Sequence, residues 1–222
     1  MNKKSPAYVL SFMAAICLVF GAGISGVNYA TQGLLAKNSA RHQNRVLCRA
    51  FMLDVAGTSA EAYQQAVDEN LQASEIGTGA AKRPMYKRIT PGHESVGFVM
   101  GGMAFWDRIE AVVVLTPDLS RILNIQFLDQ KETPGLGARV EESWFTDQFK
   151  GLQVAWSAPQ DERILIGTSP SANAPNEVDA ITGATQTSMA LMRFLNEELD
   201  RVRALYAPNR EPLNAEPLNP RP

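Results

Sequence analysis

Residues 109–128 read IEAVVVLTPDLSRILNIQFL, and this stretch decides the fold of the 222-residue chain. The segment 109–116 is rich in β-branched residues and ends at a Pro-Asp turn signal, so it predicts a strand. Along 121–128 apolar and polar side chains alternate: Leu123, Ile125 and Phe127 against Asn124 and Gln126. That pattern predicts a half-buried strand, paired antiparallel with the first through a hairpin turn at 117–120.

On both sides of this hairpin, the sequence contains further patterns that predict strands and helices. An apolar stripe at three- and four-residue intervals predicts a helix over 185–206 that packs on the sheet: Leu191, Leu195, Leu199, Val202 and Tyr206. The remaining segments predict strands at 96–100 and 163–167, helices at 31–56, 59–73 and 142–149, and loops at 76–94 and 168–177. The fold class is therefore α+β, with a mostly antiparallel sheet and packed helices.

The N-terminal region predicts a membrane anchor. Residues 7–27 read AYVLSFMAAICLVFGAGISGV and carry no charged side chain. A helix of about 20 apolar residues crosses the hydrocarbon core of a bilayer. Lys3 and Lys4 precede the span, which predicts a cytoplasmic N-terminus and a body on the extracytoplasmic side of a bacterial inner membrane. The alternative is a cleaved signal peptide, whose apolar region is usually shorter, about 7–15 residues.

These signals divide the chain into parts. We expect a cytoplasmic N-terminus at 1–6, a transmembrane helix at 7–29, a helical stem at 30–75 and a small α+β domain at 76–206. The tail at 207–222 is rich in proline and asparagine without apolar periodicity, which predicts disorder.

Composition excludes several classes of function. The net charge of −2 gives no electrostatic case for nucleic acid binding. Two cysteines cannot supply the roughly four ligands of an iron–sulfur cluster, and two histidines make a zinc site improbable. Redox chemistry would have to come from an organic cofactor. The three tryptophans, Trp106, Trp144 and Trp156, are expected in the core or at an interface.

The segment Asp179-Ala180-Ile181-Thr182-Gly183-Ala184-Thr185 stands directly before the last helix. It resembles the flavinylation motif, in which FMN is esterified through its phosphate to the final hydroxyl. A phosphodiester there would sit at a helix N-terminus, where the N–H groups of Gln186, Thr187 and Ser188 can point at it. The alternative is that Thr182 or Thr185 is an ordinary helix cap.

A second motif, Lys131-Glu132-Thr133-Pro134-Gly135-Leu136-Gly137, precedes the first by some tens of residues. It resembles the ETPGLG signature of the FMN-binding domain in two related proteins, RnfG of the Rnf electron transport complex and NqrC of the sodium-pumping NADH:quinone oxidoreductase. The order of membrane helix, stem and domain also agrees, and the resemblance covers about residues 8–205. Chain length and Lys131 favour RnfG. Thr182 stands where serine is often found.

The resemblance implies a role for each motif residue. Thr185 would carry FMN through a phosphoester bond that a flavin transferase of the ApbE type makes from FAD. Its recognition elements would be Asp179, Thr182, Gly183 and Ala184. The loop against the flavin would be formed by Glu132, Thr133, Gly135, Leu136 and Gly137.

The function that follows is that of an electron carrier. The resemblance implies a flavoprotein subunit of an ion-translocating complex, with other membrane subunits as partners and no independent catalysis. Three alternatives stay open: the NqrC protein of the sodium pump, a flavin carrier outside any pump, and a structural subunit without flavin.

Overall fold

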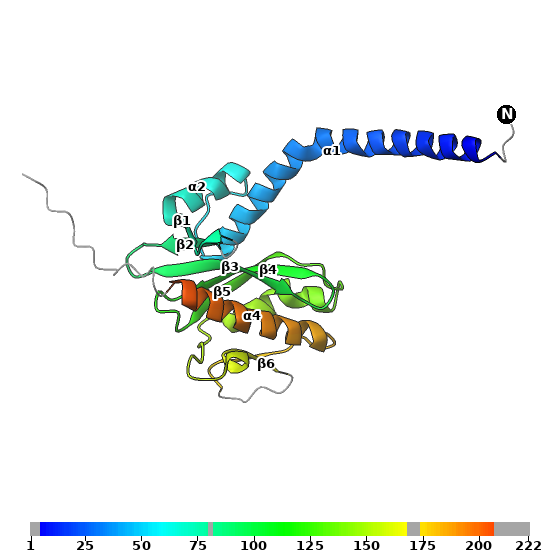
Figure 1. Cartoon of the computed structure of the whole chain (residues 1–222). Helices are drawn as coiled ribbons and strands as arrows, with labels where there is room; N and C mark the ends of the chain where they lie inside the picture. The colour runs from blue at the N-terminus through cyan, green and yellow to red at the C-terminus, as the bar shows by residue number, and fades with distance from the viewer. Residues whose placement is uncertain (1–4, 80–81, 168–173, 207–222) are drawn as a thin grey trace, which may run out of the picture. The chain divides into compact units, whose positions relative to one another are not determined.

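The structure is a computed structural model that describes residues 5–79, 82–167 and 174–206 (Figure 1). The chain divides into two compact units, Met1–His42 and Gln43–Pro222, and each is described by itself. The tail at 207–222, for which the sequence predicts disorder, lies outside the described residues.

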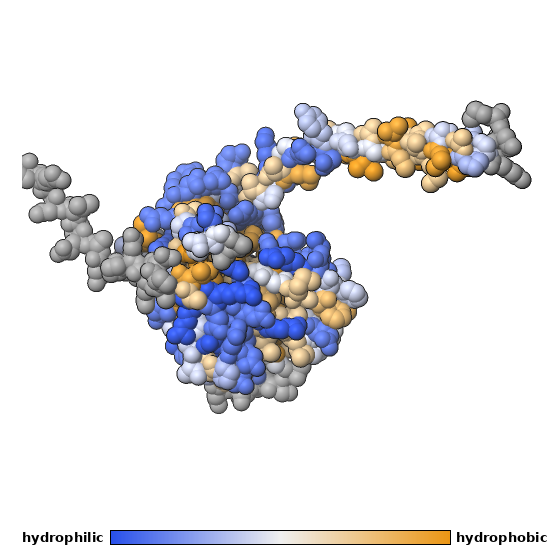
Figure 2. Space-filling model, viewed as in Figure 1, coloured by the Kyte–Doolittle hydropathy of each residue, from blue (hydrophilic) through white to orange (hydrophobic). Residues whose placement is uncertain are grey.

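Helix α1, Pro6–Ala50, makes up the first unit and enters the second with its last two turns. It is the one helix in the described part of the chain that is long and apolar enough to cross a membrane. Figure 2 shows apolar side chains along much of its exposed length. The sequence predicted a helix leaving the membrane over 31–56. That helix is present as the continuation of the apolar segment, and it ends at Ala50 rather than at 56.

The second unit is built on a five-stranded antiparallel sheet. Its strands are β1 (Leu71–Ile76), β2 (Arg83–Arg88), β3 (Ser95–Met103), β4 (Arg108–Leu115) and β5 (Ile122–Asp129), and they lie in sequence order. The predicted hairpin is confirmed, with Val113 opposite Ile125.

Two predictions in the segment before that hairpin are wrong. The predicted loop at 76–94 contains β2, because cross-strand pairing and burial of Met85 and Tyr86 outweigh its Gly, Lys and Arg content. The helix predicted over 59–73 is α2, Ala60–Asn70, which Ser59 caps by accepting from the N–H of Ala62. Residues 71–73 belong to β1.

One face of the sheet is covered by helix α4, Thr185–Tyr206, as the apolar stripe predicted (Figure 1). The core between them contains Phe98, Met100, Leu191 and Phe194. The C-terminal half of α4 is tied to β2 by the buried carboxylate of Glu198, which pairs with Arg83 and Arg201.

The other face of the sheet is covered by the end of α1 and by α2. Leu47, Cys48 and Phe51 pack there in a second apolar cluster, and burial raises the pKa of the Cys48 thiol. The prediction that β5 is half-buried is therefore wrong. Asn124 of β5 is only 2% exposed, because its side chain binds the end of α1.

The chain between β5 and α4 crosses the remaining surface in short elements. These are η2 (Gly137–Glu141), α3 (Ser143–Thr146), η3 (Asp147–Phe149), η4 (Gln160–Glu162), β6 (Leu165–Gly167) and β7 (Glu177–Asp179). The helix predicted at 142–149 is present as α3 and η3, and the strand predicted at 163–167 as β6. Strand β7 was not predicted. It pairs in parallel with β6 and leads into the 179–185 motif.

Candidate functional site

The first motif forms a tight turn after β5. The carbonyl oxygen of Thr133 accepts hydrogen bonds from the N–H groups of Leu136 (3.1 Å) and Ala138 (3.2 Å). Gly135 has a φ of 75°, a left-handed conformation that glycine adopts readily. The turn leaves Leu136 partly in solvent, 44% exposed. An apolar side chain held out by a rigid turn is available to contact a ligand.

The second motif is held by its buried residues. Ile181 is 1% exposed, and its N–H donates to the hydroxyl of Ser188, which in turn donates to the carbonyl of Ala184, both at 3.1 Å. Gly183 has a φ of 81°, and a Cβ added there would lie 3.3 Å from the Leu136 side chain. The two motifs are therefore neighbours in space, although they lie far apart in the chain.

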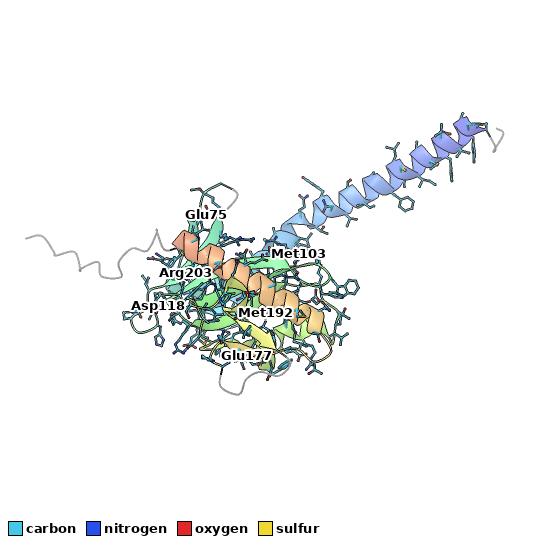
Figure 3. All side chains as sticks on the ribbon, turned by 60° about the horizontal axis from the view of Figure 1, so that its bottom comes forward. Glu75, Met103, Asp118, Glu177, Met192 and Arg203 are labelled. Atoms are coloured by element: carbon cyan, nitrogen blue, oxygen red, sulfur yellow. The ribbon has the colours of Figure 1, made fainter. Side chains whose placement is uncertain are left out.

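Both motifs line one cavity of about 350 Å³. Its walls come from three places: the turn between β3 and β4, the 132–137 turn, and the start of α4. Figure 3 shows Met103, at the end of β3, on the side where α4 begins, with Asp118 and Arg203 toward its other end. The lining residues are Phe105, Trp106, Glu132, Thr133, Leu136, Gly137, Gly183, Ala184, Thr185, Gln186 and Thr187.

The structure brings together seven of the ten predicted site residues at this cavity: Glu132, Thr133, Leu136, Gly137, Gly183, Ala184 and Thr185. Gly135, Asp179 and Thr182 do not line it. The backbone N–H of Asp179 donates to the side chain of Gln148 at 2.7 Å, while the Asp179 and Thr182 residues are exposed. Gly135 shapes the turn.

Two lining residues were not predicted as part of the site, Phe105 and Trp106, while Gln186 and Thr187 were expected there only through their backbone N–H groups. Trp106 was expected in the core or at an interface, but it is 65% exposed and packs edge-to-face on Phe105, with ring centroids 4.9 Å apart. Two adjacent aromatic residues in a strand connection were the available signal, since such a turn usually carries polar residues.

Thr185 is exposed and lines the cavity. Thr185 is the first residue of α4, and neither its hydroxyl nor that of Thr182 forms a hydrogen bond to any residue that the structure describes. The alternative that one of them caps the helix is therefore wrong. The first-turn amides of Thr185, Gln186 and Thr187 have no intrahelical acceptor. The N–H of Ser188, also expected to face a phosphate, instead donates to the Ala184 carbonyl at 3.0 Å.

One buried carboxylate connects the walls of the cavity. Glu132, 5% exposed, accepts from the hydroxyl of Thr187 at 2.6 Å and from the N–H of Trp106 at 2.9 Å. A Cβ added at Gly137 would lie 2.6 Å from the Thr187 hydroxyl and 2.7 Å from the Glu132 carboxylate. Only glycine fits there.

An exposed ion pair lies beside the cavity. Asp107 and Lys131 are each next in sequence to a lining residue, and their charged groups are 3.0 Å apart. The N–H of Arg108 and then the Lys131 ammonium lower the pKa of Asp107. The pair links the β3–β4 turn to the 132–137 turn at the surface.

The geometry admits a flat, phosphate-bearing ligand. Apolar and aromatic side chains face one part of the cavity, and a helix N-terminus with free amides faces another. A second cavity, of about 550 Å³, lies along α4 and is lined by Met189 and Met192 among others. It is larger but contains none of the predicted residues.

Comparison with known protein families indicates which kind of domain contains this cavity. Residues 104–200, which contain both motifs and every residue that lines the cavity, match the FMN-binding domain family. This part of the chain is therefore similar to FMN-binding domains, as the resemblance implied.

The relatives are RnfG and NqrC proteins, subunits of two kinds of ion-translocating complex. The chain is 25% identical over 188 residues to the RnfG-type subunit of the proton-translocating ferredoxin:NAD(+) oxidoreductase complex of Clostridium ljungdahlii, covering 84% of this chain and 85% of the relative. It is 34% identical over 87 residues to the NqrC subunit of the Na(+)-translocating NADH-quinone reductase of Pasteurella multocida, covering 39% of this chain. The matched part spans about a third of that relative, 33%.

The fold itself has a solved counterpart. The crystal structure of the NqrC subunit of the Na(+)-translocating NADH-quinone reductase from Parabacteroides distasonis superimposes with a TM-score of 0.64 at 19% identity, covering 77% of this chain and 94% of that one. The predicted α+β class is confirmed by this likeness.

Proposed function

We propose that this chain is a flavoprotein subunit of an ion-translocating electron transport complex of the Rnf type, and that it carries electrons through FMN attached to Thr185. The observation that carries the proposal is the free hydroxyl of Thr185 at the start of α4, in the same cavity as the 132–137 turn. The FMN-binding family match supports the cofactor.

Coverage favours the RnfG-type subunit over its sodium-pump relative. The match to the Clostridium ljungdahlii protein extends over 84% of this chain and 85% of the relative. A second RnfG-type protein, from the Na(+)-translocating complex of Acetobacterium woodii, is 29% identical over 193 residues. The NqrC proteins match over shorter segments, such as 87 residues in Pasteurella multocida. Partners would accordingly be the other membrane subunits of an Rnf-type complex.

Helix α1 would anchor the protein in the inner membrane. Its length and composition suit a span. Lys3 and Lys4 before it would keep the N-terminus in the cytoplasm, with the FMN-binding domain on the extracytoplasmic side. A covalent bond to the cofactor is useful there, because a dissociated flavin would be lost by dilution.

Attachment requires a group transfer. In a flavin transferase of the ApbE type, the Thr185 oxygen would bond to the FMN phosphorus of FAD while the bond to AMP breaks, and the hydroxyl proton would leave with a base of that enzyme. Three motif residues are exposed, so the transferase could contact them on the folded domain: Asp179, Thr182 and Thr185. Gly183 and Ala184 would let the donor approach.

The cavity residues would hold the bound cofactor. The first-turn amides of α4 would face the phosphate. Leu136 would contact the ring from the 132–137 turn, while Phe105 and Trp106 would limit solvent access from the β3–β4 turn. FMN supplies one- and two-electron transfer when bound, and the protein orients it and adjusts its potential.

The test is a denaturing gel of full-length protein co-expressed with a flavin transferase and viewed for flavin fluorescence. Wild type and Thr185→Ser are expected to be fluorescent, since both keep the hydroxyl, whereas Thr185→Val is expected to be dark. A dark wild-type band, with the transferase active on a control substrate, would contradict the proposal and favour a structural subunit without flavin.

Whether the protein associates with other membrane subunits distinguishes a pump subunit from a flavin carrier outside a pump. The fluorescent protein, isolated from native membranes in mild detergent, is expected to bring other integral membrane proteins with it in fixed ratio. Isolation of the loaded protein alone under conditions that preserve a known complex would favour the free carrier.

A further inference from the structure

Glu132 occupies the point where the three walls of the cavity meet. Its two carboxylate oxygens accept separate hydrogen bonds, one from the Trp106 N–H in the β3–β4 turn and one from the Thr187 hydroxyl in α4. The residue itself belongs to the third wall, the 132–137 turn. Each oxygen of Glu132 therefore accepts from a different element of the site.

The charge of Glu132 has no compensating cation. No ion pair to it occurs among the residues that the structure describes, and the neighbouring Lys131 pairs with Asp107 instead. The contrast is Glu198, which is 1% exposed and is held between two guanidinium groups, those of Arg83 and Arg201. The charge of Glu198 therefore serves ion pairs that hold the fold together, whereas the charge of Glu132 takes part in no ion pair among the described residues.

A buried charge without a partner costs free energy, because it loses hydration that neutral hydrogen-bond donors replace only in part. Gly137 makes room for the carboxylate, since a Cβ at that position would lie 2.7 Å from its oxygen. A polar side chain buried in the wall of this cavity is one of the few groups placed to orient a ligand there.

We propose that Glu132 is the positioning residue of this site, joining its three walls, and that its negative charge lowers the reduction potential of the flavin held there. The proposal rests on the proposed function. Reduction adds electron density to the flavin, and a fixed negative charge nearby disfavours that gain. The site would therefore hold a stronger reductant than the same cavity with a neutral side chain.

The charge is tested by redox titration of the flavin-loaded full chain in detergent, comparing wild type with Glu132→Gln, which keeps the shape. The ratio of reduced to oxidised flavin at a fixed potential is expected to rise about tenfold, equivalent to about +30 mV for a two-electron couple. Glu132→Asp keeps the charge, and Thr187→Val removes a donor without changing charge. Neither is expected to raise the potential.

An unchanged or lower potential in Glu132→Gln would overturn the charge effect while leaving the flavin attached, so the proposed function would stand. An equal rise in Glu132→Asp would also overturn it, because the change would then follow side-chain fit. A wild-type chain without flavin would overturn the proposed function and the charge effect together.

Positioning is tested without flavin, by hydrogen exchange at the Trp106 amide in the unloaded full chain. Protection is expected to fall at least about tenfold in Glu132→Ala and to be kept in Thr187→Val, where the bond from Trp106 remains. Unchanged protection in a folded Glu132→Ala chain would overturn the positioning role. Thermal unfolding of each variant shows whether the chain is folded.

Discussion

The side-chain amide of Asn124 in strand β5 lies 3.1 Å from the carbonyl oxygen of Ala50, the last residue of helix α1. The same amide donates to the carbonyl of Arg49 at 3.0 Å, and the Asn124 oxygen accepts from the N–H of Ile125. The last carbonyls of a helix have no partner within it. Asn124 therefore joins the end of α1 to the sheet.

We expect Asn124→Leu to destabilise the protein by about 1–3 kcal/mol, since the buried carbonyl of Ala50 loses the donor that the Asn124 side chain provides. The measurement is denaturant unfolding in detergent followed by tryptophan fluorescence. Asn44→Ala is the matched control: its amide meets the exposed Gln64 side chain, and the change is expected to stay within about 0.5 kcal/mol. Equal changes in unfolding free energy for the two variants would contradict a stabilising role for the Asn124 hydrogen bonds.

The extent of the folded domain gives a second prediction. A chain that begins at Gln43 is expected to unfold cooperatively, whereas one that begins at Leu53 is expected to be unstable. The shorter chain lacks Leu47 and Phe51, which are 1% and 2% exposed, and burial of each contributes about 1.5–3 kcal/mol. Thermal unfolding by circular dichroism distinguishes them. Cooperative unfolding of the shorter chain would favour the predicted domain start at 76, which stays a prediction.

A third prediction concerns Gly183, whose φ is 81°. In the chain without flavin, Gly183→Ala is expected to lower stability by about 1–2 kcal/mol, the cost of a left-handed residue with a Cβ. Gly183→Asn is expected to cost less, because asparagine tolerates this conformation. Both variants place a Cβ near Leu136, so their difference in unfolding free energy isolates the backbone strain. Indistinguishable stabilities would remove strain as the reason for glycine.

The fourth prediction is a pH dependence at the β4–β5 turn. The Thr116 hydroxyl, which donates to Asp118 at 2.6 Å, holds the pKa of that carboxyl below its ordinary value of 3.8. Because the pKa is lower in the folded state, the stabilising contribution is full above about pH 4 and is lost as pH falls through the folded value. We expect the melting temperature of Asp118→Asn to fall less than that of wild type between about pH 5 and about pH 2. Parallel curves would contradict it.

Local patterns predicted the elements whose stability depends on near neighbours in the chain. The β4–β5 hairpin and helix α4 carry strong periodicity, and both are where the sequence placed them. Strands β1, β2 and β7 were missed, β1 because the helix predicted over 59–73 ran into its first three residues. β7 has three residues, too few for a period, and β2 is polar, so each depends on pairing with a strand that the pattern does not show.

The features of the site likewise divide into those that the local sequence predicts and those that depend on tertiary contacts. The sequence by itself determined that Thr185 begins a helix and that the 132–137 segment is a tight turn, because hydrogen bonds between near neighbours govern both. Only the tertiary structure decided that the two meet, that Trp106 joins them, and that Glu132 is buried without a cation among the described residues. Those contacts link residues 26 and 55 positions apart, and no local periodicity encodes which distant donors a side chain will meet.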